Sequence, residues 1–222
     1  MINIYLKYQE YRLYNHIQQF NHFLNSHDIF TKYAIKPFLG EYPLHTTLYL
    51  TDYEEKNIDS VLNSIAAIAK KTSTITSSTG KLVISSGNYV MLDVKINKQT
   101  NGQNHPIRQL SDKIVTKLQW LRDTKAEIPD WARNIPVKQE AFSRYGSPNV
   151  FLEFSPHFTL MGKNFNNLQI AKQFHDNVNQ LITVYSQNSQ NQPIYLKAIA
   201  IGIGFVDNYG QITEEIASYP LG

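Results

Sequence analysis

Two short runs of this sequence repeat one pattern about half a chain apart. The first, PLHTTLYL, begins at Pro43, and the second, SPHFTLMG, contains Pro156. Each has a histidine two positions before a threonine, inside an apolar and β-branched run that is typical of a strand. The two histidines are His45 and His157 in a chain of 222 residues. This spacing suggests an approximate internal duplication, in which each half of the protein supplies one motif strand.

In a β-strand, side chains alternate between the two faces, so residues i and i+2 point the same way. His45 and Thr47 therefore share one face of their strand, with Cα atoms roughly 6.5–7 Å apart. His157 and Thr159 share a face in the same way. Each motif offers an imidazole and a hydroxyl to a common space.

This combination of groups suits the chemistry of phosphate esters. An imidazole gives or takes a proton near neutral pH, and a hydroxyl donates a hydrogen bond to a phosphate oxygen. In-line attack at phosphorus needs a base for the attacking oxygen and an acid for the leaving oxygen. Two facing His-x-Thr pairs would supply both, and this logic requires no metal.

The remaining sequence predicts an α+β fold. Apolar residues at helical spacing predict helices over 11–26, 58–69, 106–121 and 168–182, and strand-like runs cover 2–6, 72–85, 88–96 and 194–206 besides the motifs. A hairpin-type turn at Gly87 joins two of these runs, and neither half alternates cleanly enough for a parallel doubly wound sheet. We therefore expect two similar lobes of α+β structure.

The motifs PLHTTL and SPHFTL resemble the paired His-x-Thr motifs of the 2H phosphoesterases, the LigT-like superfamily that includes 2′-5′ RNA ligase-like proteins and 2′,3′-cyclic phosphodiesterases. The resemblance implies a single bilobal domain over residues 1–222, with two antiparallel sheets lining a central cleft and helices on the outer faces. It also implies metal-independent hydrolysis of cyclic or 2′-linked phosphoesters. His45 and His157 would be the catalytic acid–base pair, and Thr47 and Thr159 would bind phosphate.

Residues 123–150 show no clear periodicity and contain several prolines, so we expect a loop insertion there. Cations and aromatic residues alternate along this segment, which suits phosphate pairing and base stacking. The alternative is a solvated loop anchored by its aromatic side chains. The candidates for substrate recognition are Tyr42, Arg133, Lys138, Arg144 and Tyr145.

Composition bears on whether the protein has disulfides, metal sites or membrane segments. The chain has no cysteine, which excludes disulfides and thiolate metal sites, and its other histidines lack metal-ligand spacing. We therefore expect no metal and no cofactor. The first residues do not resemble a signal peptide, and no apolar run approaches the ~20 residues of a membrane helix. These features favour a cytoplasmic protein without membrane contact, and they leave its oligomeric state open.

The sequence thus predicts a hydrolase, a phosphodiesterase that opens 2′,3′-cyclic phosphates or cuts related 2′-linked diesters of RNA ends or nucleotides. Two alternatives stay open. One is a module that binds the phosphate of RNA or a nucleotide without turnover, and the other is an RNA 2′-5′ ligase that runs the reverse reaction. The near symmetry of the motifs also leaves open which histidine is the base.

Overall fold

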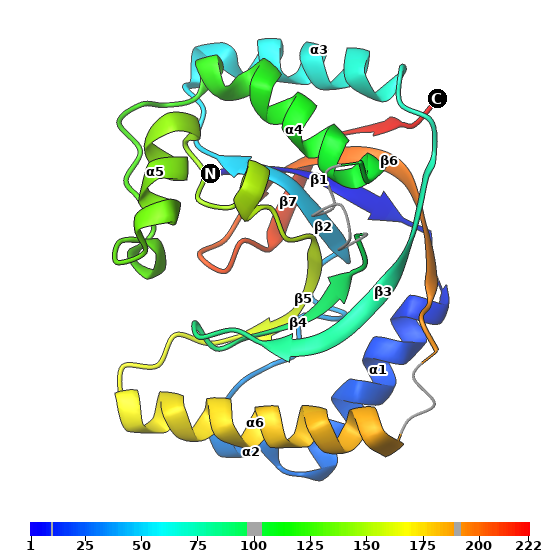
Figure 1. Ribbon diagram of the computed structural model, residues 1–222, viewed down its shortest axis with the longest axis vertical. Helices are drawn as coiled ribbons and strands as arrows, with labels where there is room; N and C mark the ends of the chain where they lie inside the picture. The colour runs from blue at the N-terminus through cyan, green and yellow to red at the C-terminus, as the bar shows by residue number, and fades with distance from the viewer. Residues whose placement is uncertain (10, 97–103, 189–191) are drawn as a thin grey trace.

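The computed structural model describes residues 1–222 except 10, 97–103 and 189–191 (Figure 1). The strands are β1 (Ile2–Tyr8), β2 (His45–Thr51), β3 (Ile75–Ile84), β4 (Tyr89–Val94), β5 (His157–Gly162), β6 (Tyr195–Val206) and β7 (Ile212–Pro220). The helices are α1 (Tyr11–Ser26), α2 (Ile29–Tyr33), α3 (Ile58–Ala69), α4 (Pro106–Leu118), α5 (Pro136–Tyr145) and α6 (Leu168–Asn188), with single turns of 3₁₀ helix between them. The predicted α+β class is confirmed.

All of the strand pairs are antiparallel, in the order β2-β1-β6-β3-β4-β5, and β7 also pairs with β6. The long strand β3 belongs to two sheets. Its first residues pair with β6, and its later residues pair with β4. The motif strands β2 and β5 lie at opposite ends of the strand order, yet they contact each other because the sheets curve. Two antiparallel sheets therefore face one another through their motif strands.

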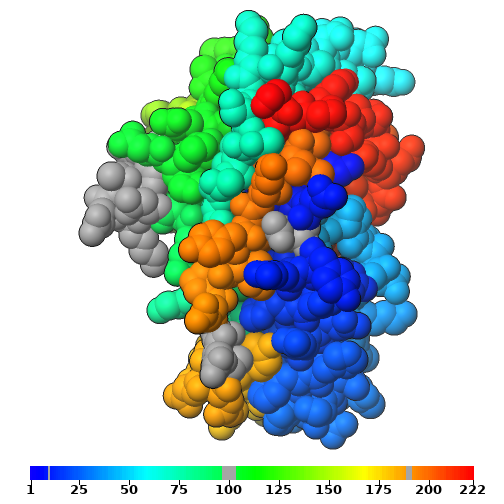
Figure 2. All heavy atoms as spheres, turned by 90° about the vertical axis from the view of Figure 1, so that its right-hand side faces the viewer, coloured from blue at the N-terminus to red at the C-terminus, as the bar shows by residue number. Residues whose placement is uncertain are grey.

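Helices cover the outer faces of both sheets. Figure 1 shows α3 and α4 on one side of the strands and α1, α2 and α6 on the other. α3 packs on β6 and β7, α4 packs on β2, and α6 packs on β3 and α1. In Figure 2 the C-terminal strand lies against α3, where the Gly222 N–H donates to the carbonyl oxygen of Thr72 at 2.9 Å. α1 belongs to the first half of the sequence, but it packs with α6 of the second half. The two lobes are therefore not the two halves of the sequence. An internal duplication stays a prediction.

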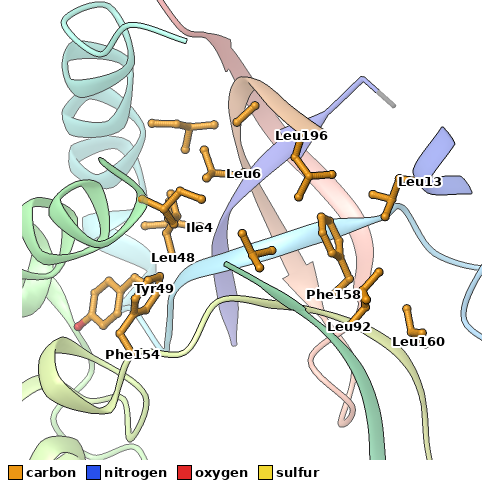
Figure 3. Close-up of a cluster of buried hydrophobic side chains, with 14 of the residues drawn as sticks. Ile4, Leu6, Leu13, Leu48, Tyr49, Leu92, Phe154, Phe158, Leu160 and Leu196 are labelled. Carbon is orange, nitrogen blue, oxygen red and sulfur yellow. The ribbon is translucent and has the colours of Figure 1, made fainter. Parts of the chain in front are cut away.

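The motif strands turn their alternate residues into the apolar core. Phe158 and Leu160, which alternate with His157 and Thr159, are fully buried, and so is Leu48 of the first motif. Figure 3 shows these three side chains in one cluster with residues of β1, β4 and β6. Burial of this face orients each histidine and threonine toward the opposite face, as the sequence pattern predicts.

Each motif ends in a β-bulge at its leucine. In the β1–β2 pairing, Thr47 and Tyr49 have consecutive partners, which leaves Leu48 as the extra residue. In the β4–β5 pairing, Leu160 is the extra residue in the same way. A bulge interrupts the ladder and re-aims neighbouring side chains. The leucine common to both motifs is thus the residue that interrupts regular pairing beside the histidine and threonine.

A donor from another element satisfies the carbonyl group at each bulge. The buried Ser111 hydroxyl of α4 donates to the carbonyl oxygen of Leu48 at 2.6 Å, and the Phe38 N–H donates to that of Leu160 at 2.8 Å. A buried carbonyl without a partner would cost about 1–3 kcal/mol. These two bonds therefore fix the bulges and, with them, the motif strands.

The prediction of a loop over 123–150 is wrong for residues 136–145, which form α5. The helix begins with Pro136 and ends at Tyr145, and the next residue, Gly146, caps it in a left-handed conformation with φ 71°. Ala141 is the only residue of this described helix that is buried, so the apolar periodicity of the helix is too weak to stand out in the sequence. Among the described residues, no helix is both long and apolar enough to cross a membrane.

Replacement of Ser111 by alanine tests the role of the first bulge. We expect Ser111→Ala to lower the free energy of unfolding by about 1–3 kcal/mol, because the carbonyl of Leu48 loses its donor in a buried position. Urea denaturation measures the change. Thr183→Ala is the control, because it removes an exposed helical hydroxyl that also bonds to a carbonyl. Equal stability losses in the two variants would contradict the interpretation.

Candidate active site

The two motif histidines are held in the same way. The ring Nδ1 of His45 lies 3.0 Å from the carbonyl oxygen of Pro43, and that of His157 lies 2.7 Å from the carbonyl oxygen of Ser155. A carbonyl oxygen only accepts hydrogen bonds, so Nδ1 must carry the proton in both rings. The neutral rings therefore keep a lone pair on Nε2, which is the atom that can take up a proton.

The structure brings the two histidines together. Each begins one of the motif strands, β2 and β5, which contact each other. A positive charge on His157 lowers the pKa of His45, so the rings lie within electrostatic reach of one another. His45 is the deeper of the two with 6% of its surface exposed, whereas His157 is half-buried.

Burial is the main influence on the acidity of both rings. It lowers the pKa of His45 and of His157 below their ordinary value of 6.5, because a buried imidazolium loses its hydration. The backbone carbonyls of Pro43 and Ser155 oppose this effect in part. The lowered pKa values favour neutral imidazoles near pH 7.

Charged neighbours make the two motifs unequal. Asp93 lies directly opposite His157 in the β4–β5 ladder, and its carboxylate raises the pKa of that histidine. The position opposite His45 in the β1–β2 ladder is occupied by Lys7. Because His157 gains a stabilising anion and His45 feels the charge of His157, we expect His157 to hold a proton more readily than His45.

The motif threonines lie on the histidine face and differ in their partners. The side-chain amide of Asn3 donates to Oγ1 of Thr47 at 2.9 Å, so the Thr47 hydroxyl keeps its own proton for donation. Thr159 is half-buried opposite Met91, and within the described part of the chain its hydroxyl makes no hydrogen bond. Both hydroxyls are thus able to donate to a bound anion.

Strand β1 contributes a polar group that sequence reasoning missed. The Tyr5 hydroxyl donates to Glu215 at 2.6 Å, and Lys7 binds the same carboxylate at 2.8 Å. The Tyr5 ring meets the His45 ring edge-on with centroids 5.3 Å apart, and it lies across Gly202, where an added Cβ would come within 2.4 Å of it. The bond to Glu215 thus holds the Tyr5 ring against the His45 ring. The signal in the sequence is the strict alternation of polar and apolar residues in INIYLK at positions 2–7.

The cations predicted to recognise substrate are each paired with carboxylates of nearby residues. The pairs are Arg133 with Glu127 and Asp130, Lys138 with Glu153, and Arg144 with Glu140. Tyr145 packs its ring on Phe151, and its carbonyl accepts from the Tyr49 hydroxyl. Over residues 1–222 without the gaps named above, no hydrogen bond, ion pair or ring contact joins these four residues to either histidine. Their contact with a substrate stays a prediction.

Tyr42, the remaining candidate, precedes β2 and lies closer to the histidines along the chain. It is half-buried, and its ring meets Phe38 edge-on at 5.5 Å. In the described ranges, no three or more His, Asp and Glu residues come together as a group that could hold a metal ion. The candidate site therefore consists of two histidines, two threonines and the charged residues that surround them.

Comparisons with known proteins identify the fold. No protein-family model matches the chain, and no curated protein matches its sequence. Among solved structures, Usb1 from Kluyveromyces marxianus aligns with a TM-score of 0.55 and 11% identity over 99% of this chain and 97% of that one. The same protein with uridine monophosphate gives a TM-score of 0.48 and 11% identity, over 99% and 98% of the two chains. The first of these alignments, at its low identity, bears on the fold alone and shows that the two chains share it.

Proposed function

We propose that this protein is a metal-independent phosphodiesterase that hydrolyses 2′,3′-cyclic phosphates, or related 2′-linked phosphodiesters, of RNA ends or nucleotides. The observation that carries the proposal is the matched geometry of the two motifs. Two imidazoles whose neutral rings keep a lone pair on Nε2, and two hydroxyls, lie on motif strands that contact each other. A site that only binds phosphate needs no pair of proton-transfer groups, so this observation favours the enzyme over the binding module.

Hydrolysis of a cyclic phosphate follows from these groups. Nε2 of His45 takes a proton from water as the water oxygen bonds to phosphorus. The bond from phosphorus to one ribose oxygen breaks, and that oxygen takes the proton from Nε2 of His157. The hydroxyls of Thr47 and Thr159 donate to the other phosphate oxygens, on which negative charge accumulates. The product is a phosphate monoester, and exchange of protons with solvent restores both rings.

The unequal surroundings of the two rings support this assignment of roles. A general base must begin neutral, and burial together with the charge of His157 lowers the pKa of His45. A general acid must begin protonated, and Asp93 opposes the effect of burial on the pKa of His157. The two protons belong to one coupled pair, so kinetics will report apparent pKa values of the pair.

Removal of either imidazole tests the proposed function. We expect His45→Ala and His157→Ala each to reduce kcat on nucleoside 2′,3′-cyclic phosphates by about 10²–10⁴-fold, because one proton transfer loses its catalyst. Product formation is followed by chromatography, and circular dichroism checks that the variants fold. His22→Ala, at an exposed position of α1, is the control and should keep full activity. Near-normal turnover by either motif variant would refute the proposal.

The pH dependence of kcat/KM tests the roles. Activity should fall at low pH as His45 gains a proton and at high pH as His157 loses one, with the maximum below pH 6.5 because burial lowers both pKa values. Asp93→Asn removes the carboxylate that raises the pKa of His157, so the alkaline limb should move to lower pH. If the acidic limb moves instead, the roles of the two histidines are reversed and this assignment is wrong.

A further inference from the structure

Helix α4 carries two buried polar side chains on one side. Seven residues of this helix are buried, and the two polar residues among them are Arg108 and Ser111. Because they are three positions apart, they lie on the same side of the helix. Ser111 holds the bulge of the first motif through the carbonyl oxygen of Leu48. Arg108 reaches the second motif in a similar way.

The Arg108 guanidinium donates to the backbone just before the second motif. Its Nη2 lies 2.9 Å from the carbonyl oxygen of Phe154, and its Nη1 donates to the carbonyl oxygen of Phe151. These carbonyl groups lie at the two ends of η5, the 3₁₀ turn Phe151–Glu153, which α4 contacts. The guanidinium also lies over the Phe154 ring, 5.6 Å from its centroid. One planar group thus bridges two carbonyl groups of the same turn.

The position of Arg108 is unfavourable for a charge. Only 5% of its surface is exposed, and among the described residues its guanidinium forms no ion pair and leaves Nε without a hydrogen bond. Burial raises the pKa of the Asp112 carboxyl one turn further along α4, and the charge of Arg108 opposes this effect. An apolar side chain of similar volume often replaces a buried charge without loss of stability. Packing alone therefore does not explain an arginine here.

The turn that Arg108 holds contains a strained residue. Phe151 has φ 51°, a left-handed conformation that residues other than glycine seldom adopt. Such a conformation persists only where the surrounding structure holds it. The bond from Arg108 to the Phe151 carbonyl is one restraint, and the packing of the Phe151 ring on Tyr145, with centroids 4.6 Å apart, is another. The strain lies six residues before His157.

Three carbonyl groups lead from this turn to His157, and each has a different donor. That of Phe154 accepts from the guanidinium, and that of Ser155 accepts from Nδ1 of His157 at 2.7 Å. The carbonyl oxygen of Pro156 accepts from the Val94 N–H at 2.9 Å. The Ser155 carbonyl, which determines the tautomer of the ring, is thus held between two fixed neighbours. Loss of the bond at Phe154 would leave it fixed from one side only.

We propose that Arg108 is a positioning residue for catalysis, because its guanidinium fixes the backbone that holds the His157 ring in one orientation and one tautomer. Ser111 acts on the first motif from the same side of the same helix. Helix α4 therefore sets the position of one motif relative to the other. The inference rests on the proposed function for its effect on catalysis, but its effect on the His157 ring is independent of that function.

The kinetic test replaces Arg108 by lysine, which keeps the charge but lacks the planar fork that bridges two carbonyl groups. We expect Arg108→Lys to reduce kcat on nucleoside 2′,3′-cyclic phosphates by about 10- to 100-fold, since a small misplacement of a catalytic group has an effect of this size. KM should stay within about threefold of wild type, because the two threonine hydroxyls remain to bind the phosphate. Thermal denaturation shows that the assay temperature lies well below unfolding.

Two further variants separate positioning from general damage. Arg108→Met fills a similar volume with no charge to bury, so it tests the same bonds if the lysine variant does not fold, and it should lose kcat as strongly. Arg122→Lys is the matched control, because Arg122 also donates to two carbonyl groups, those of Gln119 at 2.6 Å and Ser143 at 3.3 Å, which lie outside the motifs. It should keep the kcat of wild type. Equal losses of kcat at positions 108 and 122 would overturn the inference.

¹⁵N NMR of histidine-labelled protein keeps this inference separate from the proposed function. In Arg108→Lys and Arg108→Met, a share of the neutral His157 rings should carry hydrogen on Nε2, while His45 keeps its hydrogen on Nδ1. If wild type hydrolyses no substrate but His157 alone changes in this way, the proposed function fails and the positioning role stands. If wild type is active but both variants keep its kcat and its His157 resonances, the positioning role fails alone.

Discussion

Each motif histidine donates a hydrogen bond from Nδ1 to the carbonyl oxygen two residues before it, and the chemistry of the site depends on these two bonds. They fix the tautomer, and therefore leave Nε2 as the atom that exchanges protons. The β-bulge at each motif leucine interrupts regular pairing beside these rings, and a donor from another part of the chain satisfies its carbonyl group. Local hydrogen bonds within each motif thus orient one imidazole and one hydroxyl. The fold then brings the two motif strands into contact.

The similarity of the motifs does not extend to their surroundings. His45 is the more buried ring and is supported by Tyr5, whereas His157 is more open and lies opposite Asp93. Burial and hydrogen bonding to Glu215 raise the pKa of Tyr5, so its phenol stays protonated and supports the ring without competing for the reacting proton. Two identical side chains would in this way begin the reaction in different protonation states, as acid–base catalysis in one step requires.

The sequence alone predicts those features that are governed by short-range periodicity. The shared face of His45 and Thr47, the helix over 11–26 and the hairpin at Gly87 all follow from residue spacing, and all are confirmed. The alternation of Asn3 and Tyr5 with isoleucine and leucine also indicates a polar face of β1. The sequence does not predict that this face lies beside His45, because polar residues in a short N-terminal strand are ordinarily solvent-facing.

Other features are beyond such reasoning because they join distant parts of the chain. The pairing of Lys7 with Glu215 and the donations from Ser111 to Leu48 and from Arg108 to Phe154 depend on how the lobes curve together. The interleaved cations of residues 123–150 predict nucleotide contact, which stays a prediction, and local carboxylates pair with Arg133, Lys138 and Arg144. A pattern of residue types did not reveal those partners.

The tautomer and the coupling of the two imidazoles are the central claim, and ¹⁵N NMR of histidine-labelled protein measures both directly. The account predicts that in the neutral form His45 and His157 both carry hydrogen on Nδ1 and a lone pair on Nε2. It also predicts that His157 gains its proton at a higher pH than His45, and that the resonances of each ring respond when the other titrates. A hydrogen on Nε2 in either neutral ring, or two independent titrations, would contradict it.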